Sequence, residues 1–448
     1  MSTYLVDAYM VGRLPHGADA IAASSLGNTI FYAIVFFGVG LFYGLDMLVS
    51  QAFGRNDRQE ALRCFLQSLW LVVLLTPLTL LVLLATGPLL RWDGIEPGLA
   101  ASTVHYLTAL EWSTVPLLLY MALRRYLQAI DRTMAIMVSL LTANVVNFVA
   151  DWALLFGHLG FRAYGLAGSG WATVAVRVYM LALLVGAFLW HLRRDRVRFE
   201  VRDLRPSLAP LRVLLQLGWA PAIQTMADLG VSTVQTLICG RLGAVALAVN
   251  QVVLDVAAFV YMVPLGLQSA AAIRVGQAVG ADHRRGVLLA TRAANYLSAG
   301  FAGVAVVFFL LRPRWLAAIY TVDPAVVAAS VGVFAIAASY QAFDAWESTL
   351  AGSLRGLGDT QTPMYAGVFW SWIVGVPLTW GLTLHTHLGM HGLWIGRAIP
   401  SILTALTVGM LWRSRFRKLY PPTTKRRRQE IPRAMGAATL PKSAGALG

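Results

Sequence analysis

The feature that most constrains this chain is a series of eleven long apolar stretches, separated by short loops rich in Arg, Gly and Pro. A helix needs about 20 apolar residues to cross the hydrocarbon core of a bilayer, and every stretch is long enough. The stretches lie at 21–53, 64–90, 100–130, 133–156, 165–191, 213–240, 245–280, 288–311, 325–354, 361–385 and 390–412. A shorter twelfth stretch, residues 1–14, has the length of half a helix. We therefore predict an all-α membrane protein with twelve transmembrane helices, the first of them truncated.

The composition agrees with a chain built for lipid. Hydrophobic residues make up 58% of the chain and charged residues only 13%, whereas a soluble domain carries roughly 25% charged residues. The two cysteines, Cys64 and Cys239, form no CxxC pair, which argues against a disulfide or a structural zinc site. The histidines of HTHLGMH, residues 385–391, have metal-like spacing, but they lie at a span junction on the outer side and we predict no metal there.

Arginine is distributed unequally between the two sides of the predicted membrane. Successive loops lie on opposite sides of the membrane. Loop 54–63 and every second loop after it carry most of the arginines, and the segment 192–212 and the tail from Arg413 lie on the same side as these loops. By the positive-inside rule, this side is cytoplasmic. We predict a multi-pass membrane protein with a cytoplasmic C-terminus. The net charge of +15 and the run KRRR at 425–428 suit a tail beside anionic membrane lipid, so nucleic acid is not an expected partner.

The chain repeats itself at a spacing of 226 residues. The matched pairs are Gly40 with Gly266, Val49 with Val275, Gln51 with Gln277, Ala52 with Ala278, Gly54 with Gly280 and Arg58 with Arg284. The repeat predicts two pseudo-symmetric six-helix lobes of the same orientation, related by a pseudo-twofold axis along the membrane normal. The predicted boundaries are an N-terminal lobe 1–191, a cytoplasmic linker 192–212, a C-terminal lobe 213–413 and a basic cytoplasmic tail 414–448.

The repeat also indicates that the first helix is short. The phrase GRL occurs at 12–14 and at 240–242, and about thirty residues from Pro210 to Cys239 lead into the second copy, whereas eleven lead into the first. We therefore expect the first helix to lack its cytoplasmic half and the natural start to lie upstream of Met1.

Acids inside apolar segments are costly in lipid and are therefore candidates for function. They are Asp7, Asp46, Glu111, Asp151, Asp228, Asp255, Asp344 and Glu347. Asn144, Asn147 and Asp151 are three and four residues apart and share a helical face, as Asp344 and Glu347 do. An amide beside a carboxylate can bind a proton or a hard cation such as sodium, and a carboxylate in a low dielectric readily accepts a proton.

Structural roles are the alternative for each of these charges. A single buried acid can serve only to join helices by a hydrogen bond, and Asp46 and Glu111 lie near span ends, where they could snorkel or cap a helix. The number of central acids, spread over both halves, favours function. Arg177, Arg274 and Arg397 also lie within spans, and we expect them to pair with acids or to reach an interface.

Six phrases, in order along nearly the whole chain, resemble those of the multidrug and toxic compound extrusion (MATE) family of secondary antiporters. They are VDAYMVGRL (6–14), GLDMLVSQAFGRND (44–57), NVVNFVADW (144–152), GLAGSGWAT (165–173), IRVGQAVGADH (273–283) and LRGLGDTQTPM (354–364). The resemblance implies twelve helices in two lobes around a central cleft, and export of cationic amphipathic compounds in exchange for protons or sodium. It also implies a location in the bacterial inner (plasma) membrane. The chain departs from the family in the missing half of its first helix.

The resemblance also implies a cation-coupling site in the N-terminal lobe. The family's first-helix acid matches Asp7, its fifth-helix Asn and Asp match Asn147 and Asp151, and a sixth-helix threonine matches Thr173. Sodium at Asp7, Asn147 and Asp151 is the only metal binding that this pattern implies.

A second group of acids lies in the C-terminal lobe. The resemblance matches Asp228 and Asp344 to acids of the family's seventh and tenth helices. Together with Asp255 and Glu347, which lie in the same predicted lobe, they are the candidates for the substrate site.

These observations predict a secondary active antiporter that works by alternating access on small cationic substrates. We expect a monomer in membrane lipid, with no cofactor and no enzyme activity.

One alternative is a lipid-linked precursor flippase of the same superfamily, which should favour a basic cleft for pyrophosphate, whereas acids dominate these spans. A second is a membrane enzyme, but the chain has no HExxH, GxSxG or P-loop pattern and no long soluble loop. The drug and the coupling ion stay open.

Overall fold

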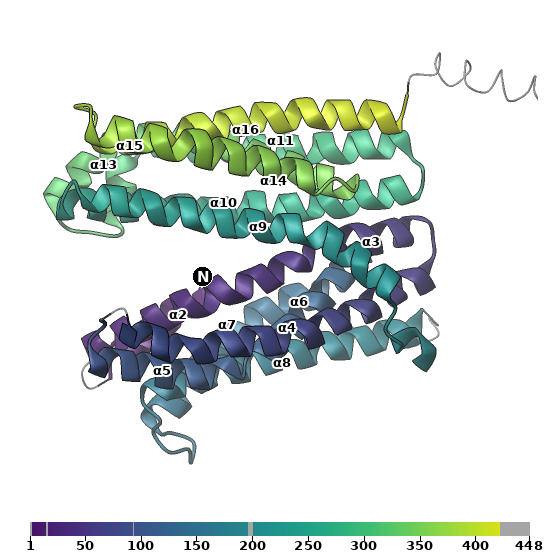
Figure 1. Ribbon diagram of the computed structural model, residues 1–448, viewed down its shortest axis with the longest axis horizontal. Helices are drawn as coiled ribbons and strands as arrows, with labels where there is room; N and C mark the ends of the chain where they lie inside the picture. The colour runs from purple at the N-terminus through teal and green to yellow at the C-terminus, as the bar shows by residue number, and fades with distance from the viewer. Residues whose placement is uncertain (1, 15–16, 93, 196–199, 422–448) are drawn as a thin grey trace, which may run out of the picture.

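The computed structural model describes residues 2–14, 17–92, 94–195 and 200–421, and in this part of the chain all regular structure is helical. The helices form two bundles that lie side by side (Figure 1). The elements are α1 (Ser2–Val11), α2 (Gly17–Leu41), α3 (Tyr43–Gly54), α4 (Arg58–Trp92), α5 (Pro97–Glu111), α6 (Thr114–Ala129), α7 (Met134–Phe156), α8 (Leu166–Arg194), the 3-10 helix η1 (Val201–Leu204), α9 (Leu208–Gly240), α10 (Ala244–Gly280), α11 (Arg284–Leu311), α12 (Pro313–Ala318), α13 (Pro324–Gly356), α14 (Gln361–Val368), the π-helical η2 (Phe369–Gly375), α15 (Val376–Leu384) and α16 (Met390–Leu419). We call α1–α8 the N-terminal bundle and α9–α16 the C-terminal bundle.

The predicted spans agree closely with these helices. Among the described residues, nine helical segments are long and apolar enough to cross a membrane, and α5 and α6 form a tenth span that is bent by 47°. The one predicted span that remains, 213–240, corresponds to α9. This helix is long enough to cross a membrane, but it carries the polar residues Gln224, Asp228 and Gln235 along a cavity and is not among the ten apolar spans. The half helix predicted at the start corresponds to α1, with ten residues.

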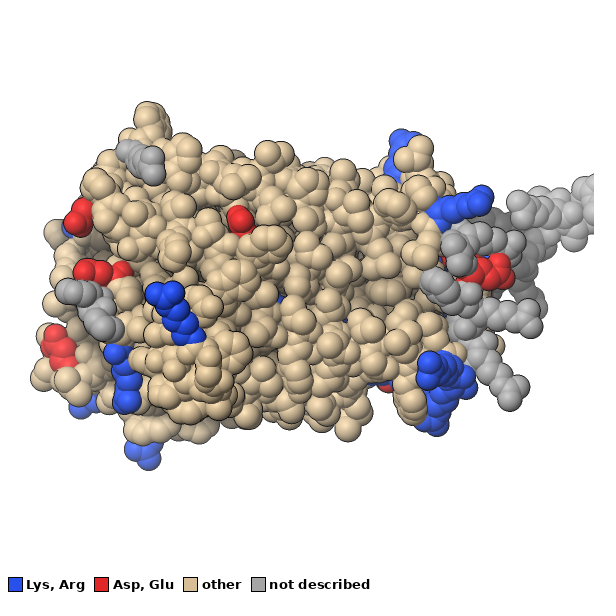
Figure 2. All heavy atoms as spheres, turned by 90° about the horizontal axis from the view of Figure 1, so that it is seen from below, with Lys and Arg blue, Asp and Glu red and all other residues tan. Residues whose placement is uncertain are grey.

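The surface has the charge distribution of a membrane-spanning protein. Figure 2 shows Lys, Arg, Asp and Glu gathered mainly at the two ends of the long axis, with a middle zone almost free of charge. Exposed leucine and phenylalanine side chains such as Leu81, Leu141 and Phe259 lie on the spans. Because exposed apolar side chains are favourable in lipid and charged ones are not, the long axis lies across the membrane.

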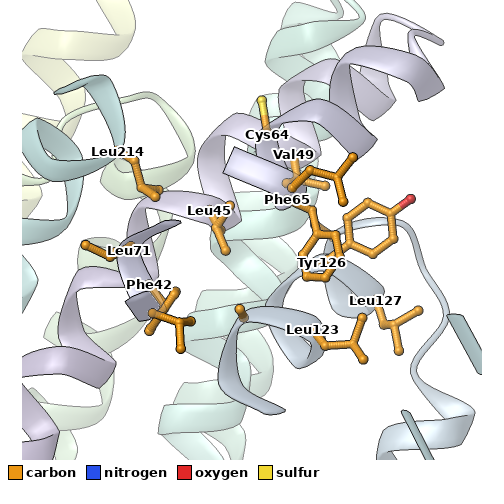
Figure 3. Packing of buried hydrophobic residues seen from close by; sticks show 14 of the residues in the cluster. Phe42, Leu45, Val49, Cys64, Phe65, Leu71, Leu123, Tyr126, Leu127 and Leu214 are labelled. Atoms are coloured by element: carbon orange, nitrogen blue, oxygen red, sulfur yellow. The ribbon is translucent and has the colours of Figure 1, made fainter. Parts of the chain in front are cut away.

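The core of the N-terminal bundle also receives a helix from the other half of the chain. Phe42, Leu45, Phe65 and Tyr126 are buried together in this cluster, and Leu214 of α9 joins them (Figure 3). Glycine makes this close approach of α9 possible, since a Cβ at Gly218 would lie 2.2 Å from the carbonyl oxygen of Leu41. The first half of α9 therefore packs on the N-terminal bundle and its second half belongs to the C-terminal bundle.

The two copies of the repeated phrase meet each other. Gly54 ends α3 and Gly280 ends α10. A Cβ at Gly54 would lie 2.1 Å from the backbone oxygen of Gln277, and a Cβ at Gly280 would lie 2.1 Å from that of Gln51. Only glycine permits such an approach of two backbones. We call Gln51, Gly54, Gln277 and Gly280 the clasp.

The glutamines of the clasp also make reciprocal hydrogen bonds across the two bundles. Gln51 donates from Nε2 to the carbonyl oxygen of Gly356 at 3.1 Å, and Gln277 donates from Nε2 to that of Ala129 at 3.0 Å. The acceptors are at the C-terminal ends of α13 and α6, where helix carbonyls lack intrahelical partners. The clasp thus closes the two bundles against each other at the end that carries loops 55–57, 130–133, 281–283 and 357–360, which we call the arginine-rich end.

The connection between the bundles is bound to α4. Asp203 of η1 accepts hydrogen bonds from Arg63 at 2.9 Å and Gln59 at 2.8 Å, and Gln67 donates to its backbone oxygen at 2.9 Å. Trp70 donates to the backbone oxygen of Leu204 at 2.7 Å. The described part of the predicted linker is therefore attached to the N-terminal bundle.

Candidate functional site

Asp7, Asn147 and Asp151 form a compact polar group in the N-terminal bundle, which we call the trio. Asn147 and Asp151 lie one turn apart on α7, and the amide of Asn147 donates to Asp7 at 2.8 Å and to Asp151 at 3.1 Å. Asn147 is 2% exposed and Asp151 is fully buried. One amide group, that of Asn147, thus joins the carboxyl groups of Asp7 and Asp151.

The trio keeps unused acceptor atoms. Within the described structure, Oδ1 of Asn147 and Oδ1 of Asp151 are buried without a hydrogen-bond partner. Buried polar atoms are usually paired, so these two oxygens are available to a proton or to a cation that prefers oxygen ligands.

The other two residues predicted near this group bond within their own helices. Thr173 on α8 donates to the backbone oxygen of Ser169 at 3.1 Å. Asn144 on α7 donates to the backbone oxygen of Leu140 at 2.9 Å. The structure thus unites Asp7, Asn147 and Asp151, and a coupling role for Thr173 stays a prediction.

Arg177 is a neighbour of the trio whose partners the sequence did not indicate. This residue of α8 interacts electrostatically with Asp7, but its hydrogen bonds go to neutral groups. It donates to the hydroxyl of Ser113 and, at 3.4 Å, to that of Tyr32, and its guanidinium lies 4.8 Å from the ring centroid of Phe31. No ion pair between Arg177 and an acid is present in the described structure, so of the two expectations for this residue, an acid or an interface, the acid partner is not seen.

All four predicted acids of the C-terminal half line one cavity of about 510 Å³. Asp228 comes from α9, Asp255 from α10, and Asp344 and Glu347 from α13. Asp255 accepts a hydrogen bond from Gln251 at 2.9 Å. The cavity is within the range of about 300–1,000 Å³ typical of small-molecule sites.

The cavity also has neutral polar and aromatic lining. Tyr261 and Tyr340 line it, and the hydroxyl of Tyr261 lies 3.3 Å from that of Ser348. Gln341 and Ser401 line it with buried polar atoms that have no partner in the described structure. Aromatic faces and free polar atoms around a cavity are what an amphipathic ligand needs.

A single arginine, Arg397 of α16, lies among the residues that line this cavity. It donates to the side-chain oxygen of Gln235 at 2.8 Å and to the hydroxyl of Tyr340 at 3.4 Å. Its guanidinium lies 4.9 Å from the ring of Tyr340 and 5.8 Å from that of Trp394. As with Arg177, the expected direct ion pair is absent from the described structure.

Two other sequence expectations are settled by ion pairs. Asp46 neither snorkels to water nor reaches a surface: it is fully buried, and Arg125 pairs with it at 3.1 Å. Of the two structural alternatives, snorkelling does not apply, because the packing of α6 against α3 covers this position, whereas Asp46 does lie in the first turn of α3. Arg274 pairs with Asp131 at 3.0 Å, so the prediction of an acidic partner is confirmed for this arginine. Glu111 ends α5 at the bend before α6.

No group of three or more His, Cys, Asp or Glu side chains in the described residues is arranged to hold a metal ion. His385 of the predicted histidine segment packs against Trp380, with ring centroids 4.4 Å apart and ring planes tilted by 51°. Cys64 and Cys239 are both free and buried.

Comparison with known proteins gives consistent relatives. A profile of the MatE family matches residues 1–153 and 221–380. The chain is 32% identical over 412 residues to a probable multidrug resistance protein NorM of Rhizobium meliloti, with 91% of this chain and 87% of that protein covered. It is 33% identical over 425 residues to a protein of the same description from Pseudomonas putida, with 92% and 90% covered. A crystal structure of MATE in the bent conformation has the same fold, with a TM-score of 0.85, 20% identity, and 93% of this chain and 91% of that chain covered.

Proposed function

The chain belongs to the MatE family of membrane transporters, and on that premise we propose that it exports cationic, amphipathic compounds in exchange for protons or sodium. One observation carries the proposal: each bundle has its own group of acids, the trio in one and the cavity acids in the other. Two sites of unlike chemistry allow two different cations to be exchanged. The small trio suits a proton or a sodium ion, and the roomy cavity with its aromatic lining suits an organic cation.

Coupling follows if the two cations are not carried in the same state. A cation at Asp7 and Asp151 adds positive charge in a low-dielectric interior, and this charge disfavours an organic cation in the same molecule. When the coupling ion leaves toward the inside, the substrate can bind. Each proton that moves inward down the membrane potential releases about 2.3 kcal/mol per 100 mV, which drives the export.

The trio has the donor atoms for either ion. The free Oδ1 atoms of Asn147 and Asp151, together with the Asp7 carboxylate, are oxygen ligands of the kind that hard cations prefer. The same carboxylate oxygens can take up a proton instead, because an ionised carboxylate has several lone-pair sites that accept one. Both ions therefore remain part of the proposal.

Orientation and assembly complete the proposal. The protein acts as a monomer in the inner membrane of a bacterium, with the arginine-rich end and the C-terminus in the cytoplasm, because cytoplasmic loops carry the excess of Arg and Lys. The alternative of a lipid-linked precursor flippase is less favoured by the cavity, because its four carboxyl groups outnumber its one guanidinium, and carboxylates repel a pyrophosphate.

Gradient-driven transport tests the proposal. The full chain is reconstituted in liposomes, and movement of ethidium is followed while a pH gradient or a sodium gradient is imposed separately. We expect dye to move opposite to one of the two ions and not to move without a gradient. Folded protein that moves no dye under either gradient, but moves a lipid-linked pyrophosphate, would show that the flippase alternative is right.

A further inference from the structure

Each bundle carries one arginine at a corresponding place near its acids, and neutral groups hold both. Arg177 lies on α8, the last helix of the N-terminal bundle, and Arg397 lies on α16, the last helix of the C-terminal bundle. Each donates to a tyrosine hydroxyl, Tyr32 or Tyr340, and lies against an aromatic ring. A buried guanidinium normally pairs with a carboxylate. Two arginines that avoid this pairing in the same way need an explanation.

Arg397 is held in place without help from the acids. Its two hydrogen bonds and the rings of Tyr340 and Trp394 fix the guanidinium from several sides. Gln235, its closer acceptor, is itself 3% exposed and bonds to Thr379 at 3.4 Å. The guanidinium therefore cannot swing away when a ligand enters the cavity.

The acids of the cavity are left without a direct counter-ion. Arg397 interacts electrostatically with Asp344 and Asp228, but in the described structure no cationic nitrogen lies within 4.0 Å of either carboxylate, nor of Glu347. One wall of the cavity thus carries the fixed positive charge of Arg397. The other walls carry carboxylates that are free to bind the positive charge of a ligand.

We propose that Arg397 is a specificity-determining residue that limits the charge of the transported compound: the cavity accepts one cationic centre beside the acids and rejects a second one near α16. The inference rests on the proposed export of organic cations. In a cavity of about 510 Å³, a second cationic centre cannot lie far from the guanidinium. Two like charges about 10 Å apart at an effective dielectric constant of about 20 repel each other enough to change affinity by roughly tenfold.

The test compares two dyes that share a ring system. Ethidium carries one permanent positive charge and propidium carries two. Efflux of both is measured from the same cells or liposomes for the wild type, Arg397→Gln and Arg397→Lys, with Arg314→Gln at the exposed end of the molecule as the matched control. Binding of each dye to the purified proteins is measured in parallel by fluorescence.

Arg397→Gln should raise the propidium-to-ethidium ratio of binding and of efflux by about tenfold. Arg397→Lys keeps the charge but not the planar hydrogen bonds, so its ratio should stay near that of the wild type, as should that of Arg314→Gln. An unchanged ratio in Arg397→Gln overturns the inference. An equal rise in the Gln and Lys variants also overturns it, because the effect would then come from lost packing.

The same measurements distinguish failure of the charge limit from failure of the proposed drug export. If the wild type exports neither dye, drug export itself is refuted. If the wild type exports ethidium and the ratio does not respond to Arg397, only the charge limit is refuted. A misfolded variant is recognised by its thermal unfolding in detergent. If Arg397→Gln is misfolded, Arg397→Met, which also removes the charge, replaces it, and an unchanged dye-binding ratio in that variant overturns the inference.

Discussion

At the scale of single residues, the buried charges of this protein are accommodated in three different ways. Asp46 has an ionic partner in Arg125, which also lies 4.0 Å from the ring of Tyr43. Arg397 has neutral partners, as described above. Asp7 and Asp151 share the amide of Asn147. Asp46 also keeps a buried Oδ1 without a partner, but Arg125 compensates its charge directly. Because the acids of the trio and of the cavity have no such ion pair in the described structure, we assign function to them and structure to Asp46.

The role of the trio is tested by removing one titratable group. Asp151→Asn keeps the shape of the side chain and one acceptor oxygen, but it can no longer gain or lose a proton. In liposomes, gradient-driven dye export by this variant should fall to the level of liposomes without protein, while its amount and helical content stay normal. Thr142→Ser, at a hydroxyl that bonds within α7 at 2.7 Å, is the control and should export normally. Normal export by Asp151→Asn would make the trio a structural feature.

The structural role of Asp46 predicts a loss of stability. Asp46→Asn removes the negative charge and leaves the buried Arg125 uncompensated, which typically costs about 3–5 kcal/mol. The melting temperature in detergent should therefore fall by many degrees. The double variant Asp46→Leu with Arg125→Met removes both charges and should recover most of the loss. If the single and the double variant melt alike, the ion pair does not account for the burial of Asp46.

At the scale of elements, the contact between α3 and α10 depends on glycine. The two helices approach so closely at Gly54 and Gly280 that backbone oxygens occupy the space of a side chain. Glycine weakens a helix interior, but both residues stand at helix ends, where this cost is small. The same argument explains how α9 approaches Leu41 through Gly218.

Gly54→Ala should destabilise this contact. The added Cβ would lie 2.1 Å from the backbone oxygen of Gln277, so the helices must separate, and overpacking of this kind costs about 1–3 kcal/mol. Gly266→Ala, on α10 in open space with no atom within 4 Å, is the matched control and should not lower the melting temperature. Thermal unfolding of the two variants under one set of conditions gives the comparison. Equal melting temperatures would mean that the contact is looser than described.

At the scale of the whole molecule, the clasp holds the two bundles together at one end. Under the proposed alternating access, this end has to open so that the sites can face the other side of the membrane. The reciprocal bonds of Gln51 and Gln277 end on neutral carbonyl oxygens, and hydrogen bonds of this kind contribute only about 0.5–1.5 kcal/mol each. Such a contact can close the end and still open during a transport cycle.

A disulfide across the clasp should stop transport reversibly. The Cβ of Ser50 would lie 3.1 Å from a Cβ at position 276, near the separation of about 3.5–4.5 Å found in disulfides. The double variant Ser50→Cys with Gly276→Cys should lose dye export when oxidised and regain it on reduction. The single variants, treated in the same way, control for the substitutions themselves. Export that continues in the fully cross-linked protein would show that this end need not open.

The sequence alone determined the spans, the internal repeat, the family and the identity of the acids. Hydropathy and charge patterns are properties of contiguous residues, so eleven stretches could be predicted to within a few residues of the helices. The face shared by Asn147 and Asp151 was predictable for the same reason, because both lie on one helix.

The tertiary structure alone decided which of these residues meet. Gln51 bonds to a residue 305 positions away, and Asn147 reaches Asp7 over 140 positions. The neutral partners of Arg397, the burial of Asp46 and the packing of Leu214 in the N-terminal bundle likewise depend on helices that are distant in the chain. One sequence carries no record of such distances, because they are set by how the side chains of different helices pack and not by the order in which they occur.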